Sequence, residues 1–219
     1  MRRSRQLAAA ALATVVATGI GVAPVPEAAV SAANRTCDVS GAVVLAASPQ
    51  VRVYRLPKTK GRQVFACYVP RPWVFALDSP REGEDRSAVT AVAVSGSWIC
   101  YALQVPTPND DPVLVSGLNM KTRQGSSSYA IASNAPQEDS ISGLVINSRG
   151  NWAWIAYANF GSDMAERQVL SQRASSRRAT LLDSGLDIAP RSLALSVDGR
   201  TIYWKHGGAD SSARITPGP

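Results

Sequence analysis

Few side chains in this 219-residue chain could perform acid–base or nucleophilic chemistry. His206 is the single histidine, and it lies in the glycine-containing stretch 205–208 just after an apolar run. A histidine beside the end of a strand is a reasonable place for a general base. However, no serine occupies a G-x-S-x-G elbow that could supply a nucleophile. We therefore expect His206 to be a solvated loop residue.

Carboxylates gather in three polar stretches between apolar runs. Two carboxylates placed across a glycosidic bond can hydrolyse it, and acidic loops can hold calcium. None of the three groups has the alternating spacing of a calcium loop. We expect solvated turn residues, and a secreted hydrolase that uses loop carboxylates is the alternative. The groups are Glu82, Glu84 and Asp85, then Asp110 and Asp111, then Glu138 and Asp139.

The chain has three cysteines, at positions 37, 67 and 100. In an oxidising compartment two of them can pair and one is left over. We predict a disulfide between Cys37 and Cys67; three buried thiols are the alternative. No C-x-x-C motif occurs, and one histidine is too few for the usual zinc site. The residues therefore indicate no catalytic, cofactor-binding or metal-binding site.

Basic residues form two clusters in the sequence, and the formal net charge is +7. A nucleic-acid footprint would combine such clusters with aromatic residues, but the export predicted below argues against nucleic acid as a partner. Attraction to an anionic cell wall or membrane surface is physically sensible, and a merely soluble surface is the alternative. The clusters are Arg52, Arg55, Lys58, Lys60, Arg62 and Arg71, then Arg167, Arg173, Arg177 and Arg178.

Residues 1–33 have the pattern of a cleaved signal peptide: arginines, an uncharged apolar run over residues 7–22 and then small residues. We expect cleavage after Ala33, with Ala32 or Ala29 as alternatives. A retained membrane anchor would need about 20 apolar residues, and proline and glutamate interrupt the run before that. No later segment is apolar enough to span a membrane. We therefore expect a secreted or cell-envelope protein whose folded domain covers residues 34–219.

Four segments of the mature chain share one pattern, which is an apolar strand, a tight turn and a second strand that carries aromatic residues. The turns lie near residues 49, 96, 150 and 199. The clearest copy has Asp198-Gly199 between two apolar runs, which predicts a type I′ hairpin. Tryptophan or tyrosine recurs on the second strand of each unit, so we expect these rings to pack between units. The four segments are 42–56, 89–103, 141–157 and 192–204.

Four antiparallel strands per repeat is the composition of a propeller blade. The first three units each contain two further candidate strands after the hairpin, at 63–69 and 73–77, at 113–120 and 127–132, and at 166–173 and 177–182. The fourth unit lacks its last strand. The mature N-terminus, Arg35 to Val39, offers a spare strand, so we expect that it completes the fourth unit and closes a small ring. The alternative is an open array.

The stretch from Ser196 to Trp204, Ser-Val-Asp-Gly-Arg-Thr-Ile-Tyr-Trp, resembles the repeat signature of TolB-like and related WD40-like propellers. That signature is roughly Ser-Pro-Asp-Gly-Lys-x-Ile followed by aromatic residues, and Val197 replaces its proline. The resemblance implies a propeller fold in an exported bacterial protein. It implies no activity, because propellers serve as binding platforms and as enzymes alike.

The sequence thus predicts an all-β, propeller-like array of about four four-stranded antiparallel units, closed as a small ring or left open. An open array would expose sheet edges and favour self-association. The function we expect is an exported, non-enzymatic binding module that contacts a protein or a cell-envelope polymer through its loops. The secreted hydrolase is the alternative.

Overall fold

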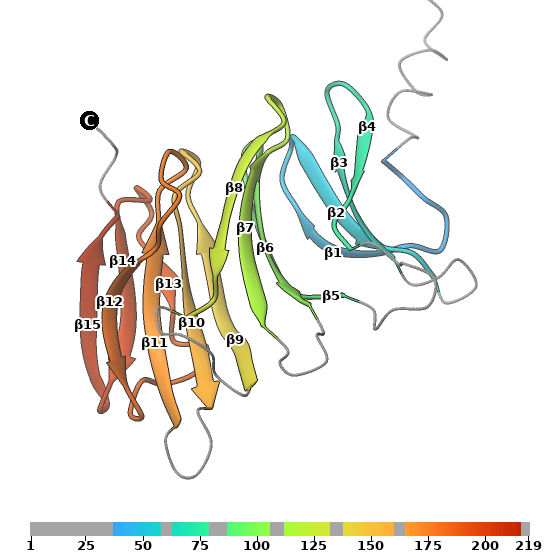
Figure 1. Cartoon of the computed structure of the whole chain (residues 1–219). Helices are drawn as coiled ribbons and strands as arrows, with labels where there is room; N and C mark the ends of the chain where they lie inside the picture. Colours follow the sequence, from blue (N-terminus) through green and yellow to red (C-terminus); the bar gives the residue numbers. More distant parts are fainter. Residues whose placement is uncertain are drawn as a thin grey trace, which may run out of the picture.

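The computed structural model describes residues 37–57, 63–78, 87–105, 112–131, 138–159 and 165–215, without the side chains of Glu138 and Asp139. Their secondary structure is all strand and turn, with no helix within those ranges. The strands form four antiparallel sheets that stand in a row (Figure 1). The predicted signal peptide and the residues Arg35 and Thr36 lie outside the described ranges.

Each sheet is a simple meander of consecutive strands. The first holds β1 (Val43–Ala47), β2 (Val51–Arg55), β3 (Val64–Tyr68) and β4 (Trp73–Ala76). The second holds β5 (Ala88–Ser95), β6 (Trp98–Gln104), β7 (Val113–Asn119) and β8 (Gln124–Tyr129). The third holds β9 (Glu138–Ile146), β10 (Trp152–Asn159), β11 (Ala165–Gln172) and β12 (Thr180–Gly185). The fourth has three strands, β13 (Ala194–Leu195), β14 (Thr201–His206) and β15 (Ala209–Arg214).

The sheets pack face to face like propeller blades, and a separate apolar cluster fills each gap between neighbours. Strand β10 shows how the sequence produces this arrangement. Trp152 and Trp154 face the second sheet, whereas Ala153 and Ile155 face the fourth. Alternate side chains of a strand point to opposite faces, so a strand buried on both faces is apolar throughout. The predicted packing of tryptophans between units is confirmed at these positions.

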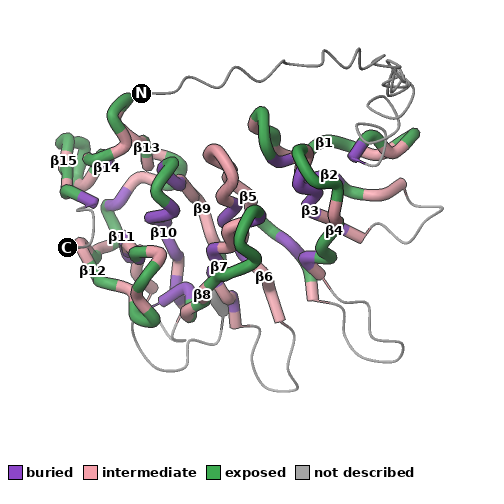
Figure 2. The backbone as a smooth tube through the Cα atoms, turned by 90° about the horizontal axis from the view of Figure 1, so that it is seen from above, coloured by how far each residue is buried: buried purple, intermediate pink, exposed green. Residues whose placement is uncertain are grey.

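The first strands of the units lie side by side along the inner edge of the row, where β5 contacts both β1 and β9 (Figure 2). Each of these three strands is interrupted by a bulge in its pairing with the next strand, at Leu45, Thr90 and Ser142. A bulge bends and twists a strand. Its recurrence at the same place supports the division into repeated units.

The array is open. The four apolar clusters of the described residues join neighbouring sheets or cover the first sheet, and none joins the fourth sheet to the first. The prediction that the N-terminal segment completes the fourth sheet is wrong for residues 37–39. Cys37 and Val39 instead pack on the first sheet against Tyr54 and Phe65. Burial of apolar surface there stabilises this placement.

In each unit a turn joins the first two strands, and this turn contacts the equivalent turn of the next unit. Ser48 Oγ donates a 2.7 Å hydrogen bond to the carbonyl of Gly96. Asn147 Nδ2 donates a 2.8 Å hydrogen bond to the carbonyl of Gly199. The second and third units meet where Gly150 packs against Trp98, since a Cβ on Gly150 would lie 2.3 Å from the Trp98 ring. Each link therefore ends on a glycine of the next unit.

These three glycines have φ angles of 56°, 81° and 68° at positions 96, 150 and 199. The left-handed region is readily occupied by glycine. Asp198 is not among the residues with positive φ, so the predicted type I′ turn at Asp198-Gly199 is wrong. The segment is instead a longer loop with one left-handed residue, which lets it meet Asn147 of the neighbouring unit.

Candidate functional site

Arginine and lysine side chains collect at one end of the array. Because every sheet is a meander, the turns after β1, β3, β5, β7, β9, β11 and β13 all lie at this end. We call it the basic end and define it by eight exposed cations on these turns. They are Arg71, Lys121, Arg123, Arg149, Arg173, Arg177, Arg178 and Arg200.

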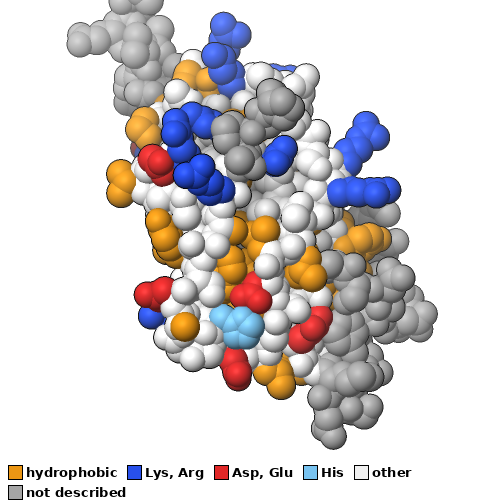
Figure 3. Space-filling view, turned by 90° about the vertical axis from the view of Figure 1, so that its left-hand side faces the viewer, with side chains coloured by type: hydrophobic (Ala, Val, Ile, Leu, Met, Phe, Trp, Pro, Cys, Tyr) orange, Lys and Arg blue, Asp and Glu red, His pale blue; other side chains and the backbone are white. Residues whose placement is uncertain are grey.

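Within the described ranges, Asp198 is the one carboxylate on the turns of the basic end, and it sits beside Arg200 at 3.9 Å. Hydrogen bonds from Ser196 Oγ and from the backbone N–H of Arg200 hold the pKa of Asp198 below its ordinary value. Among the other described carboxylates, Asp78, Asp183 and Asp210 lie toward the opposite end of the strands. Figure 3 shows this separation on one face, with most of the Lys and Arg side chains above and most of the Asp and Glu side chains and the histidine below.

Part of the basic end is an open hollow of about 990 Å³ between the first and second sheets. One wall is the β3–β4 turn with Pro70, Arg71 and Pro72, and the other is the β7–β8 turn, residues 121–123. Tyr68 and Trp73 form the apolar part of the lining. Three cations and no carboxylate line this hollow.

The side chain of Arg123 stacks over Trp73. Its guanidinium carbon lies 4.7 Å from the centroid of the indole ring, a distance typical of a cation–π contact. Phe75 packs edge-on against Trp73 with a centroid distance of 6.4 Å. The stack orients the guanidinium at the mouth of the hollow.

Such a site can bind anions. Guanidinium groups present a planar fork of donors that matches carboxylate and phosphate oxygens. Exposed cations attract a polyanion over about 10 Å at moderate salt. Aromatic and proline surfaces in the same hollow add apolar contact area.

The structure rearranges the two basic clusters predicted from the sequence. Arg71 joins the basic end, whereas Arg52 lies within β2, pairs with Asp38 and belongs to neither end. In the second cluster, residues 173, 177 and 178 lie on the β11–β12 turn at the basic end. Arg167 lies near the opposite end, where it donates to the carbonyl of Leu186 at 2.8 Å. Lys58, Lys60 and Arg62 lie outside the described residues.

Lys121, Arg123, Arg149 and Arg200 were not recognised as site residues from the sequence. Arg149 and Arg200 are each the one cation of their turn, and Lys121 and Arg123 form only a pair, so no longer run of charge marks these positions. The available signal was the repeat itself, because equivalent turns of a meander must reach the same end of the molecule.

His206 is the last residue of β14 and not a loop residue, so that prediction is wrong. Its Nδ1 lies 2.9 Å from Asp183 Oδ2, and the same carboxylate oxygen accepts a 2.6 Å hydrogen bond from Trp204 Nε1. Burial alone would raise the pKa of Asp183, but the hydrogen bonds from Trp204 and His206 and the charge of His206 together lower it. The three residues join the third sheet to the fourth.

The structure brings none of the acidic residues of the hydrolase alternative together within the described ranges. Glu82, Glu84, Asp85, Asp110 and Asp111 lie outside the described residues. Glu138 and Asp139 begin β9, at the end opposite the basic end. Over the described ranges, no group of three or more His, Cys, Asp or Glu side chains is arranged to hold a metal ion.

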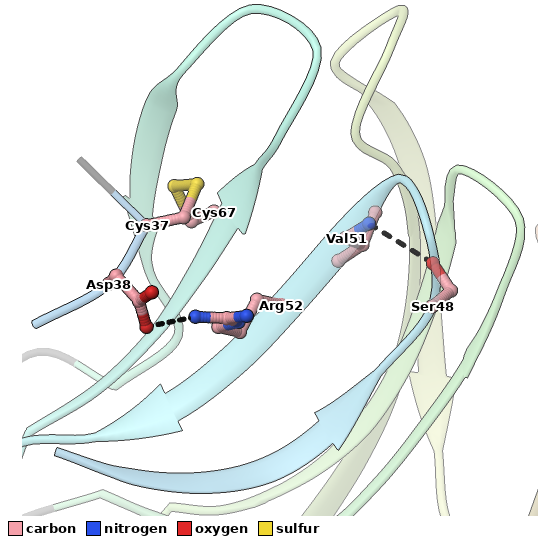
Figure 4. The surroundings of a disulfide bond; sticks show 6 residues. All are labelled: Cys37, Asp38, Ser48, Val51, Arg52 and Cys67. Carbon is pink, nitrogen blue, oxygen red and sulfur yellow. Dashed lines mark hydrogen bonds and ion pairs between the residues drawn. A yellow bond between two sulfur atoms is a disulfide. The ribbon is translucent and has the colours of Figure 1, made fainter. Parts of the chain in front are cut away.

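The predicted disulfide between Cys37 and Cys67 is confirmed, with a Cα–Cα distance of 5.5 Å. It fastens residues 37–39 to β3, next to the ion pair of Asp38 and Arg52 (Figure 4). Cys100 is a free, buried cysteine, and burial raises the pKa of its thiol well above the ordinary value. Within the described ranges we find no helix with the length and apolarity needed to cross a bilayer.

Comparisons with known proteins find no matching family model and no curated protein with significant similarity. Among solved structures, the acylaminoacyl peptidase of Pyrococcus horikoshii aligns at 13% identity and a TM-score of 0.39, over 54% of this chain and 17% of the peptidase. A chain of a nidogen/laminin complex aligns at 10% identity and a TM-score of 0.40, over 75% of this chain and 57% of that chain. A chain of the mitotic checkpoint complex aligns at 16% identity and a TM-score of 0.30, over 78% of this chain and 64% of that chain.

This chain spans less than two thirds of the length of each of these three proteins. With TM-scores below 0.5, these similarities carry no functional assignment.

Proposed function

We propose that this protein is an exported binding module that attaches to an anionic polymer of the cell envelope through its basic end. The main support is that turns from all four units bring eight cations to this end. Asp198 is the one described carboxylate on these turns. Such a surface concentrates polyanions by Coulomb attraction. The turns are joined unit to unit through Gly96, Gly150 and Gly199, so the surface is held in one shape.

Export is part of this proposal. It is supported by the signal-peptide pattern of residues 1–33 and by the disulfide between Cys37 and Cys67, because disulfides persist in oxidising compartments. The motif from Ser196 to Trp204 supports placing the chain with TolB-like and WD40-like propeller repeats. Loops and turns that a rigid scaffold holds in place commonly carry binding residues.

The proposal is tested by retention of the purified protein on immobilised polyanionic cell-wall polymer across a series of salt concentrations. We expect binding at low salt that weakens steeply as salt rises, because released counterions drive such association. A variant with Arg149, Arg173, Arg177 and Arg200 all changed to Glu reverses the charge of the basic end and should lose retention.

The control reverses two cations away from the basic end, and it is compared with Arg149→Glu/Arg177→Glu so that the change in net charge is the same. Changing Arg167 and Lys205, on β11 and β14, to Glu should leave most of the retention intact. Equal loss in both variants would show that net charge alone governs attachment. Absence of retention of the unaltered protein at low salt would contradict the proposed function.

A further inference from the structure

The backbone of Arg123 is held in a conformation that ordinary residues avoid. Its φ is 62°, in the left-handed region that is unfavourable for residues with a Cβ. The preceding residues impose this geometry, since Asn119 Oδ1 accepts the N–H groups of Lys121 and Thr122 at 2.9 and 3.2 Å. The N–H of Arg123 itself donates to the carbonyl of Asn119 at 2.7 Å.

A glycine would adopt this conformation without strain, and yet the position holds an arginine. Strained residues that persist in a structure cluster at ligand-binding sites, where the strain places a side chain for its task. At Arg123 the strained backbone carries the guanidinium onto the ring of Trp73, 4.7 Å from its centroid.

The stacked guanidinium keeps its donors for another molecule. The structure shows no carboxylate or carbonyl acceptor for the Arg123 side chain among the described residues. Stacking on the indole removes part of its conformational freedom before a ligand arrives. Preorganisation of this kind raises affinity, because less ordering remains for the binding step.

Like charges also converge on this hollow without compensation. Arg71, Lys121 and Arg123 all line it, and its lining contains no carboxylate. Three cations around one hollow give it a positive potential. An anionic group bound there would gain from that potential and from charge-assisted hydrogen bonds.

From these observations we propose that the hollow between the β3–β4 and β7–β8 turns is a binding subsite for an anionic glycan. A sugar ring packs on Pro70, Pro72 and the part of the Trp73 ring that Arg123 does not cover. Its anionic group is held by Arg123 together with Arg71 and Lys121. The anionic group is a phosphate diester or a uronate carboxylate, because a guanidinium fork fits both. This inference rests on the proposed function and names its ligand class and its central residue.

The test is calorimetric titration of the purified protein at moderate salt with four short oligomers of similar length. These are an oligosaccharide linked through phosphate diesters, an oligogalacturonate, a neutral oligosaccharide and a single-stranded oligonucleotide. We expect binding of one or both charged glycans, tighter than the oligonucleotide, and none of the neutral sugar. The relative affinities of the two charged glycans identify the anionic group.

Variants locate the site. Arg123→Ala should weaken binding of the charged glycan by about tenfold or more, the usual effect of losing a charge-assisted contact. Arg123→Lys should weaken it similarly, because lysine keeps the charge but lacks the fork and the flat stacking surface. Arg177→Ala removes one charge elsewhere on the basic end and should change affinity by no more than about threefold. Thermal melts of all variants confirm that they remain folded.

The outcomes separate this inference from the proposed function. If Arg177→Ala weakens binding as much as Arg123→Ala, attachment is diffuse, the subsite is wrong and the proposed function stands. Tightest binding of the oligonucleotide, or equal binding of the neutral sugar, would overturn the assigned ligand class. Failure of the unaltered protein to bind any polyanion even at low salt would refute the proposed function itself.

Discussion

The carboxylate of Asp183, on the last strand of the third sheet, is shared between His206 and Trp204 of the fourth. Its Oδ2 lies 2.9 Å from His206 Nδ1 and 2.6 Å from Trp204 Nε1. On the other side of the imidazole ring, a Cβ on Gly185 would lie 3.0 Å from Nε2. This contact fastens the short fourth sheet, which has three strands, to the rest of the array.

The Asp183 contact predicts a dependence of stability on pH. The pKa of Asp183 is lowered from its ordinary value of 3.8 in the folded protein, so the unfolded chain takes up a proton at higher pH than the folded one does. The stabilisation is fully present above the ordinary value and is lost as pH falls through the lowered pKa. The free energy of unfolding, measured in urea from pH 6 downward, should decrease over that range.

Asp183→Asn should flatten that decrease, because the amide does not titrate. The control is Asp210→Asn, which removes an exposed carboxylate paired with Lys205 and should leave the pH profile nearly unchanged. A profile that is the same in Asp183→Asn and in the unaltered protein would contradict the prediction.

Gly150 is expected to tolerate no side chain. A Cβ there would lie 2.3 Å from Trp98 Cε2, and the φ of +81° is itself unfavourable for alanine. Gly207 has a φ of +58° but no neighbour within 4 Å of its Cβ position, so it is the matched control. Gly207→Ala should cost about 1 kcal/mol from backbone strain, and Gly150→Ala should cost about 2–4 kcal/mol because overpacking adds to the strain. Chemical denaturation measures both, and equal losses would show that the contact with Trp98 is unimportant.

Asn147 performs two tasks that substitutions can separate. Its Oδ1 accepts the N–H groups of Arg149 and Asn151 at 3.0 Å, and its Nδ2 donates to Gly199 in the next unit. Asn147→Asp keeps the acceptor but turns a carboxylate oxygen toward the Gly199 carbonyl at a buried position, so it should cost about 2–4 kcal/mol at neutral pH. Asn147→Ala loses both hydrogen-bonding groups without adding a charge and should cost about 1–3 kcal/mol. A smaller loss for Asn147→Asp than for Asn147→Ala in urea unfolding would mean that the link to Gly199 contributes nothing.

Removing the disulfide should destabilise the protein more than removing the free thiol does. The cysteines are separated by 30 residues in sequence, and closing a loop of that length contributes about 3–4 kcal/mol in the chain-entropy account. We expect Cys37→Ala/Cys67→Ala to lose roughly that amount. Cys100→Ala removes one buried sulfur atom and should lose about 1 kcal/mol. Thermal unfolding measures the loss of stability in both variants. A smaller loss for Cys37→Ala/Cys67→Ala than for Cys100→Ala would contradict the prediction.

Arg123→Gly should separate stability from binding. Glycine relieves the strain at φ 62°, worth about 1 kcal/mol. The substitution also removes the stack on Trp73 and adds conformational freedom to the unfolded chain. Each of these two effects lowers stability by about 0.5–1 kcal/mol. Stability should therefore stay within about 1 kcal/mol of the original, whereas affinity for the charged glycan falls as in Arg123→Ala. A large loss of stability would show that Arg123 serves the fold.

The repeat pattern could be predicted from the sequence because its causes are local. Alternation of apolar residues defines a strand wherever it occurs, as at Val113–Asn119, where Val113, Val115 and Gly117 are buried in turn. The hairpin at each turn follows from the few residues between two such runs. The disulfide could be predicted because only three cysteines were available and two of them lie in the first unit.

The openness of the array and the basic end depended on contacts between distant residues. Cys37 and Val39 pack on the first sheet, against Tyr54 and Phe65. The local pattern of apolar residues could not predict this, because packing on the fourth sheet would also bury apolar surface. The glycines that follow His206 predict a loop, but its partner Asp183 lies 23 residues away and comes from another sheet.

By itself, then, the sequence determined the strands, their grouping into four units and the cysteine pair, because these depend on neighbours along the chain. Only the tertiary structure decided which side chains share a surface. Arg71 and Lys121 lie 50 positions apart in the chain, yet they line one hollow. Their meeting depends on how two sheets pack, and sheet packing is set by the buried clusters between the units and by the links that end on Gly96, Gly150 and Gly199.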